Sequence, residues 1–223
     1  MPIIVTRLVR LTAAAGLAIA SGATLTACQT TGYEQASLTS QRLSDTRLEL
    51  YAAKPVLKDA TSNLNALIDE EQPSLVPQYR RFANSVDELE EQEQDIRDST
   101  AAMRTRHAAY VQNWERDLET ISDAELRQQA QDRLTKTRSE FDTLDDEIAD
   151  VRDRFSALVS NLRDVQRILA NDLTARGLDA IKSTASEIND EEQAVQEAID
   201  TLIARMDDMS AQLSAAAVAP RDR

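Results

Sequence analysis

Residues Leu126 to Leu173 read LRQQAQDRLTKTRSEFDTLDDEIADVRDRFSALVSNLRDVQRILANDL, and this stretch decides the fold. Apolar residues recur in it at alternating intervals of four and three, with charged, amide or small polar residues at most positions between them. A sustained repeat of 3.5 residues keeps one apolar stripe facing neighbouring helices, so it predicts a long helix in coiled-coil packing. The repeat consists of Ala130, Leu134, Thr137, Phe141, Leu144, Ile148, Val151, Phe155, Leu158, Leu162, Val165, Leu169 and Leu173.

A first helix is predicted from about Ala36 to Glu70. Leucines recur every seven residues in it, and Thr, Ala and Leu occupy the companion positions. Pro55 interrupts this pattern, and an interior proline removes a backbone hydrogen bond, so we expect a kink or break near Tyr51 to Lys54. The two series are Leu43, Leu50, Leu57, Leu64 and Thr46, Ala53, Ala60, Leu67.

A second helix is predicted from about Gln78 to Glu119, after a turn at Glu71 to Pro77 that contains two prolines. One of its two series is apolar throughout, whereas the other contains polar residues. Polar residues in a coiled-coil core lower stability but fix register and partner number. The series are Phe82, Leu89, Ile96, Met103, Tyr110 and Val86, Glu93, Thr100, His107, Trp114.

Two further turns are expected around the long helix. Ser122 and Glu125 have the spacing of a capping box, which places a tight turn at Thr120 to Asp123. Gly177 followed by Leu178 is typical of a glycine C-cap, and the apolar pattern changes phase there, which predicts a chain reversal. The last helix then carries Leu178, Ile181, Ala185, Ile188, Glu192, Val195, Ile199, Leu202, Met206, Met209 and Leu213.

These segments predict an all-α protein, an elongated up-down four-helix bundle or antiparallel coiled coil over residues 36–214, with a disordered tail at 215–223. Short turns make successive helices antiparallel neighbours. The second and third helices are expected to be the longest. Their hairpin should therefore project past the other two, at the end where the first helix begins.

The N-terminus has the pattern of a bacterial lipoprotein signal peptide over residues 1–27. Arg7 and Arg10 are followed by an apolar run of thirteen residues, too short for a spanning helix of about 20. Leu25-Thr26-Ala27-Cys28 resembles a lipobox, which is cut before a diacylated cysteine, and Cys28 is the chain's one cysteine. The alternative is an ordinary secretory signal with a free cysteine near its end.

Acyl chains, palmitate among them, on Cys28 would anchor the mature chain to a membrane, because each buried methylene contributes about 0.8 kcal/mol. In enteric-type bacteria, Asp after the cysteine favours the inner membrane, and Gln29 stands there instead. We therefore expect an outer-membrane lipoprotein that faces the periplasm, with residues 28–35 as a lipidated tether.

Composition argues against several function classes. The 223 residues carry a net charge of −14, and no basic face for nucleic acid is visible. The single histidine, His107, lies in a helix repeat and has no second His or Cys beside it, so we expect no metal site, no cofactor and no catalytic residues. The acidic run from Asp87 to Asp95 is interpreted as a solvated helix face, with cation binding as the alternative.

Large side chains gather before the Thr120 to Asp123 turn. Tyr110, Trp114, Leu118 and Ile121 either fill a wide bundle end or contact a partner or the lipid interface, where Trp and Tyr are favoured. We name Trp114 and Ile121 as candidate partner contacts. The net negative charge disfavours docking on anionic lipid, which favours a protein partner or a contact on the cell-wall side.

From about Tyr110 onward the chain resembles a family of uncharacterised, coiled-coil-rich bacterial lipoproteins known only as a domain of unknown function. The resemblance rests on Trp114-Glu115, Leu118-Glu119, Ser122, Leu126, Leu134, Thr137-Arg138 and Phe141, and on the run from Asn171 to Ile181. It implies a lipid-anchored helical protein and assigns no activity or functional residue.

Three functions remain in competition. The first is a non-enzymatic, membrane-tethered scaffold or adaptor that associates with itself or with a protein partner. The second is a tethered periplasmic chaperone or envelope-transport accessory, which open, apolar-lined helical arms would favour. The third is an enzyme with a site that the sequence does not reveal, although no small-molecule substrate is evident.

Overall fold

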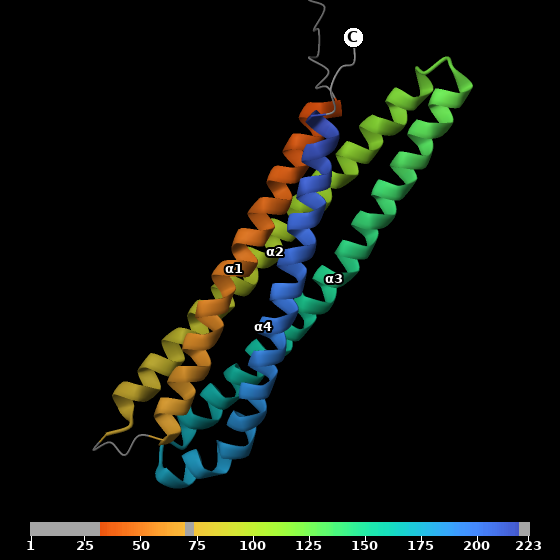
Figure 1. Ribbon diagram of the computed structural model, residues 1–223. Coiled ribbons are helices and arrows are strands. Elements are labelled where there is room, and N and C mark those ends of the chain that lie inside the picture. Colours follow the sequence, from red (N-terminus) through yellow and green to blue (C-terminus); the bar gives the residue numbers. More distant parts are fainter. Residues whose placement is uncertain (1–31, 70–73, 219–223) are drawn as a thin grey trace, which may run out of the picture.

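The computed structural model describes residues 32–69 and 74–218, which form four long helices in an antiparallel bundle (Figure 1). The described residues contain no strand. The predicted all-α, up-down architecture is confirmed. The helices are α1 (Gly32–Asp69), α2 (Val76–Glu119), α3 (Ala124–Asn171) and α4 (Ala175–Val218).

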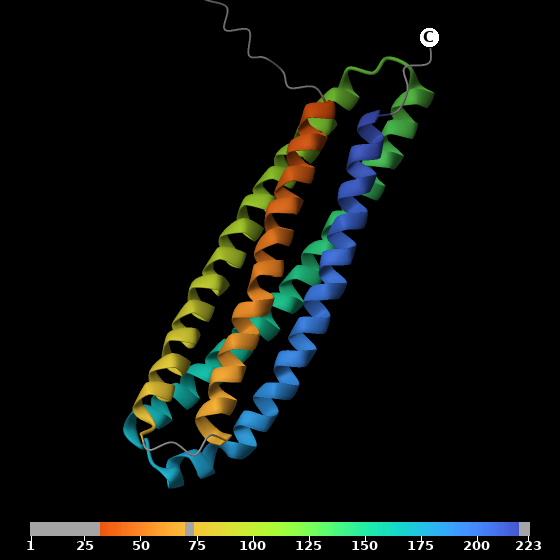
Figure 2. The ribbon, with the colours of Figure 1, turned by 60° about the vertical axis from the view of Figure 1, so that its left-hand side comes forward.

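Helices that follow one another in the sequence pack together, and α1 also packs against α4, so each helix has two neighbours and the bundle closes into a square. The turned view in Figure 2 shows the same arrangement. The start of α1 and the end of α4 lie at the same end of the bundle as the α2–α3 connection.

The predicted apolar repeats form the core. All eight repeat positions of α1 are buried, as are the apolar series of α2 and the α3 series from Phe141 to Leu169. In α4 every apolar position of the predicted series is buried, whereas Glu192 is half-buried. A continuous core therefore runs along the bundle, and we call this four-helix part the shaft.

The first helix departs from expectation at Pro55, because α1 runs through it without a break. Tyr51, whose carbonyl loses its helical partner, is 67% exposed, and Pro55 is exposed as well. Water can therefore bind the freed carbonyl. On the opposite face, buried Ala53 and Leu57 hold the helix against its neighbours.

The third helix ends earlier than Gly177, and the expectation that this glycine caps it is wrong. α3 ends at Asn171, and Gly177 lies in the first turn of α4. The N–H of Gly177 donates to Thr174 Oγ1 at 3.2 Å, so Thr174 caps the new helix. A Cβ on Gly177 would lie 2.1 Å from the backbone oxygen of Asp172, which explains why this buried position holds glycine.

The cap before α3 is Asp123 and not Ser122. Asp123 has an extended backbone (φ −73°, ψ 124°), and its Oδ1 accepts the N–H of Leu126 at 2.9 Å. The predicted turn is confirmed, but the capping residue is the next one along the chain. An extended backbone places the side-chain oxygen over the third N–H of the helix, and Asp123 has that conformation.

Three predicted helix boundaries and the predicted order of helix lengths also differ from the structure. α1 begins at Gly32, within the expected tether, and Gln35 and Ala36 in its first turns are buried. α2 begins at Val76, with Pro77 in its first turn. α4 continues to Val218, past the expected start of the tail. α3 is the longest helix at 48 residues, whereas α2 and α4 both have 44.

Candidate partner-binding site at the hairpin end

The α2–α3 hairpin extends beyond the start of α1. Gln92 donates to the backbone oxygen of Glu49 at 3.2 Å, and Arg106 contacts Gln35 through its side chain. Fourteen residues separate the two positions on each helix, so the antiparallel register is constant. The same register puts Gly32 opposite Ala109, and the rest of α2 extends about 15 Å further at 1.5 Å per residue.

The hairpin extends equally far beyond α4. Asn161 donates to Glu191 at 2.8 Å, and Arg205 lies 4.0 Å from Glu147, again with fourteen residues between the positions on each helix. This register places the last residue of α4 opposite Leu134, about 15 Å from the start of α3. We call residues 109–134 the hairpin end, and Figures 1 and 2 show it standing clear of α1 and α4.

The hairpin end has a small core of its own. Val111, Leu118 and Leu134 are buried together, separately from the core of the shaft. Trp114, Ile121 and Ala130 pack against them and remain half-buried. Two helices thus cover each other here without α1 and α4.

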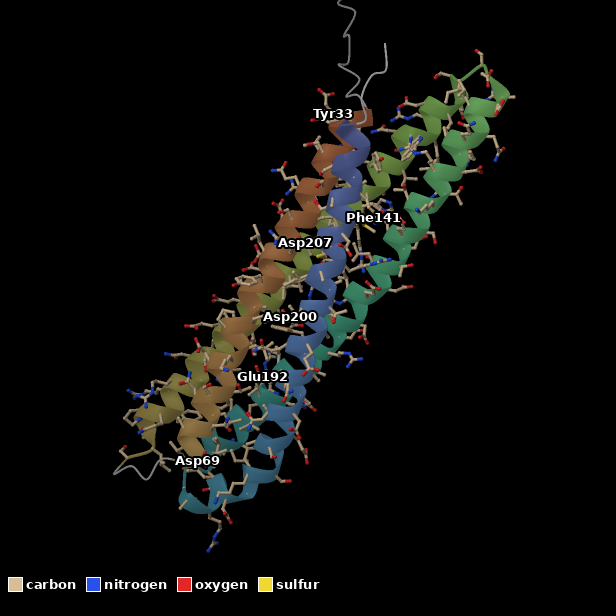
Figure 3. All side chains as sticks on the ribbon, viewed as in Figure 1. Tyr33, Asp69, Phe141, Glu192, Asp200 and Asp207 are labelled. Carbon is tan, nitrogen blue, oxygen red and sulfur yellow. The ribbon has the colours of Figure 1, made fainter. Side chains whose placement is uncertain are left out.

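A hollow of about 280 Å³ opens where α1 begins beside the hairpin. Aromatic rings dominate its wall, and Arg133 and Asp117 supply charge. Figure 3 labels Tyr33 at this end of α1. The lining residues are Gly32, Tyr33, Gln35, Ala36, Tyr110, Asn113, Trp114, Asp117 and Arg133.

A second hollow of about 220 Å³ lies between the hairpin and the end of α4. Tyr110, Trp114 and Arg133 line both hollows, so the two flank a shared wall. We call the pair of hollows the notch. The second hollow is completed by Lys136, Thr137, Glu140, Phe141, Met209, Gln212 and Leu213.

The shared wall combines two tilted aromatic rings with the guanidinium group of Arg133. The rings of Tyr110 and Trp114 lie 5.5 Å apart at 55°, a tilted arrangement that aromatic pairs prefer. Burial raises the pKa of Tyr110, and the nearby Arg133 opposes that shift, so the phenol stays protonated at neutral pH. Arg133 is exposed and forms no ion pair with a described residue.

His107 lies on α2 on the shaft side of Tyr110 and stacks on Phe141, with ring centroids 3.8 Å apart and planes at 12°. Figure 3 places Phe141 on the shaft side of the hairpin end. The Nε2 atom of His107 is buried and finds no hydrogen-bond partner within residues 32–69 and 74–218. Burial lowers its pKa, Arg138 lowers it further, and Asp142 and Asp145 partly oppose this. His107 is therefore a packing residue held in the neutral form.

The structure places Trp114 and Ile121, the two candidate contacts, in one small apolar cluster but on different surfaces. Trp114 lines both hollows of the notch. Ile121 lies in the connecting turn, where its carbonyl accepts two bonds from Arg127. Cys28 and residues 1–31 lie outside the described residues.

The acidic run of α2 forms part of the shaft surface. Glu90 pairs with Arg163 of α3, and Glu93 pairs with Arg97 one turn along α2. Asp87, Glu88, Glu91 and Asp95 are exposed. Among the described residues there is no group of three or more His, Cys, Asp or Glu side chains arranged to hold a metal.

Sequence reasoning missed Tyr33, Arg133 and Met209 as lining residues of the notch. They come from three helices, and although Met209 belongs to the predicted apolar series of the last helix, nothing in the sequence places the three near one another. For Tyr33 a signal existed, because the seven-residue repeat of α1 extends back from Leu43 to Ala36 and so brings the helix start closer to Tyr33. For Arg133 no local pattern distinguishes it from the other arginines.

The fold defines an elongated antiparallel four-helix bundle with a protruding two-helix end. The chain belongs to the family described as a protein of unknown function (DUF2959), whose model matches residues 25–215. This confirms the expected membership of a family of unknown function. Neither the comparison with curated proteins nor the comparison with solved structures gives a match. None of the described helices has a long enough apolar stretch to cross a membrane.

Proposed function

We propose that the protein is a lipid-anchored, non-enzymatic scaffold or adaptor of the bacterial envelope that binds a protein partner at the notch. The anchor is the acylated Cys28, in the outer membrane and facing the periplasm. The observation that carries the proposal is the contrast between a shaft whose apolar repeats are covered by its own helices and a notch with aromatic walls.

The notch suits a protein partner. Its walls offer Tyr33, Tyr110 and Trp114, and buried aromatic anchors supply much of the energy at protein interfaces. Arg133, which forms no ion pair with a described residue, adds a cation that a carboxylate of the partner can bind in bidentate fashion. Together they favour a partner segment with apolar side chains and at least one acidic group.

The anchor is tested by the mass of the protein extracted from its own membranes. We expect acyl chains on a chain that begins at Cys28, and an unprocessed or soluble protein for Cys28→Ala. A mature N-terminus elsewhere, without lipid, would contradict the proposed anchor and localisation.

The partner site is tested by photocrosslinking in cells. A crosslinker at half-buried Asn113, which lines the first hollow, is compared with one at exposed Asp150 in the middle of the shaft. We expect adducts of defined mass at Asn113, their loss with Trp114→Ala, and circular dichroism unchanged by that substitution. Adducts at Asp150 alone would make the flank of the shaft the working surface.

A second function is favoured by the extension of the hairpin end beyond the start of α1 and the end of α4 (Figure 1). Open, apolar-lined helical arms are what a tethered chaperone or transport accessory requires. The two functions differ in selectivity, because an adaptor gives a few adducts of fixed mass at Asn113, whereas a chaperone gives many. Suppression of the aggregation of an unfolded client by the purified protein, lost in Trp114→Ala, would support the chaperone.

A further inference from the structure

The reach of the N-terminal tether and the length of the hairpin end are nearly equal. Four residue steps separate Cys28 from Gly32, which span at most about 14 Å when fully extended. The hairpin end projects about 15 Å past Gly32 in the same direction, as the register of α1 and α2 requires. A shaft standing on the membrane therefore cannot lift Gly32 high enough to clear the hairpin end from the surface.

The outermost residues of the hairpin end present apolar side chains beside carboxylates. Leu126 is 58% exposed in the first turn of α3, and Ile121 is half-buried in the connection. Glu119 and Glu125 are exposed, and Asp123 caps α3. The cation in this group is Arg127, whose guanidinium bonds the carbonyl of Ile121.

This composition fits one kind of lipid surface. Carboxylates are repelled by anionic headgroups, but they can pair with the ammonium group of an aminophospholipid such as phosphatidylethanolamine. Apolar side chains such as Leu126 gain from leaving water for the headgroup and acyl boundary. The local charge of the hairpin end therefore selects a zwitterionic surface.

We infer that the tip of the hairpin end, residues 119–127, is seated on the zwitterionic surface of the membrane that holds Cys28, as a second point of attachment. This inference rests on the proposed lipid anchor. With the tether on one side and the tip on the other, the shaft stands on two contacts, and the notch opens close to the lipid surface. A partner would then reach the notch along the membrane.

Depth-dependent quenching of tryptophan fluorescence tests this placement. Trp114 is the chain's only tryptophan, so a Trp114→Phe background accepts one reporter at a time. Leu126→Trp places the reporter at the tip, and Ile168→Trp is a matched control on the same helix. The side chains of Leu126 and Ile168 are 58% and 51% exposed, and the two residues lie about 63 Å apart along α3.

The lipidated protein is reconstituted in vesicles of phosphatidylethanolamine and phosphatidylcholine that contain brominated acyl chains. We expect loss of emission from Leu126→Trp and no loss from Ile168→Trp, with a weaker loss at the tip when phosphatidylglycerol replaces phosphatidylethanolamine. No loss at Leu126→Trp, or equal loss at both positions as for a shaft lying flat, would overturn the inference. A loss of emission from Leu126→Trp that varies with protein density but not with bromine would also overturn the inference. It would show that the tip contacts a second copy of the chain.

Two further measurements separate the causes. An intact mass without acyl chains contradicts the proposed anchor, whereas lipidated protein without quenching at Leu126→Trp contradicts the seated tip alone. Eight Gly and Ser residues inserted between Thr31 and Gly32 should reduce quenching at Leu126→Trp, because a longer tether lets the tip leave the surface. Quenching that survives the insertion would overturn the argument from tether length.

Discussion

The shaft and the hairpin end are built from the same two helices, α2 and α3, yet they differ in how those helices are covered. In the shaft each helix has two neighbours, and Leu144 and Phe155 are at most 2% exposed. In the hairpin end each has one, and Trp114 and Ile121 remain half-buried.

The repeat of α3 changes character where the neighbours end. From Phe141 to Leu169 it is Phe, Leu, Ile or Val without exception, whereas nearer the hairpin connection half-buried Ala130 and Thr137 flank buried Leu134. Small and polar residues leave less apolar surface to cover, so a two-helix segment remains tolerable in water. The spacing of the repeat thus specifies a helix, and its small and polar members lie where fewer helices cover it.

The largest expected effect is in the core of the shaft. Phe155→Ala should lower the free energy of unfolding by about 3–5 kcal/mol, because the cavity it leaves is enclosed by packed helices. Urea denaturation followed by circular dichroism measures the change. Exposed Asp146→Ala is the control and should stay within about 0.5 kcal/mol, and equal effects from both substitutions would contradict the buried repeat.

The same truncation in the hairpin end should cost less and act locally. Leu134→Ala removes a side chain that is 1% exposed from a cluster of three buried residues, and we expect a loss of about 2–3 kcal/mol. Hydrogen exchange should show faster opening of residues 109–134 with the shaft still protected. Uniformly faster exchange along all four helices would show that the hairpin end and the shaft unfold as one unit.

The turn at the far end of the shaft should be sensitive to a single methyl group. In Gly177→Ala the new Cβ meets the backbone oxygen of Asp172, and we expect a loss of about 1–3 kcal/mol. Gly32→Ala, beside the notch, is the matched control, because its added Cβ meets no described atom within 4 Å apart from its chain neighbours and the backbone of its own helical turn. Thermal melts compare the two, and a neutral Gly177→Ala would contradict the close approach in the α3–α4 turn.

A smaller effect concerns the cap of the hairpin. Asp123→Ala should cost about 1 kcal/mol, because the N–H of Leu126 loses its side-chain acceptor. Ser122→Ala should stay within about 0.5 kcal/mol, since the side chain that caps α3 is that of Asp123. A larger loss from Ser122→Ala than from Asp123→Ala in the same melts would restore the capping box that the sequence predicts.

The smallest expected effect is on the pH dependence of the free energy of unfolding, through His107 at the boundary between the shaft and the hairpin end. Burial lowers the pKa of His107, so the unfolded chain binds a proton more readily than the folded one. The free energy of unfolding should therefore fall as pH drops through about 6.5, the ordinary pKa of histidine, and level off below the folded pKa. His107→Gln should remove this component from denaturation curves collected at several pH values, and an unchanged pH profile would contradict the buried neutral ring.

Much of this molecule could be predicted from its repeats. The leucines of α1, the apolar series of α2 and the Phe141 to Leu169 run of α3 are buried as their spacing requires. The errors lie at the boundaries, where a cap is decided by one backbone angle, as at Asp123, or by one close approach, as at Gly177. The size of Trp114 and its position near a turn mark it as a candidate contact in the sequence, but they do not predict the two hollows that it lines.

The sequence by itself determined four helices, their order, their buried faces and the end to which the hairpin points, because these follow from a periodicity carried by each segment alone. Only the tertiary structure decided that α1 continues through Pro55, since burial of Ala53 and Leu57 outweighs one lost backbone bond. It also decided the notch, in which Arg133 of α3 lines one hollow with Tyr33 of α1 and the other with Met209 of α4. The register between antiparallel helices brings such residues together, and it depends on how all four helices pack at once.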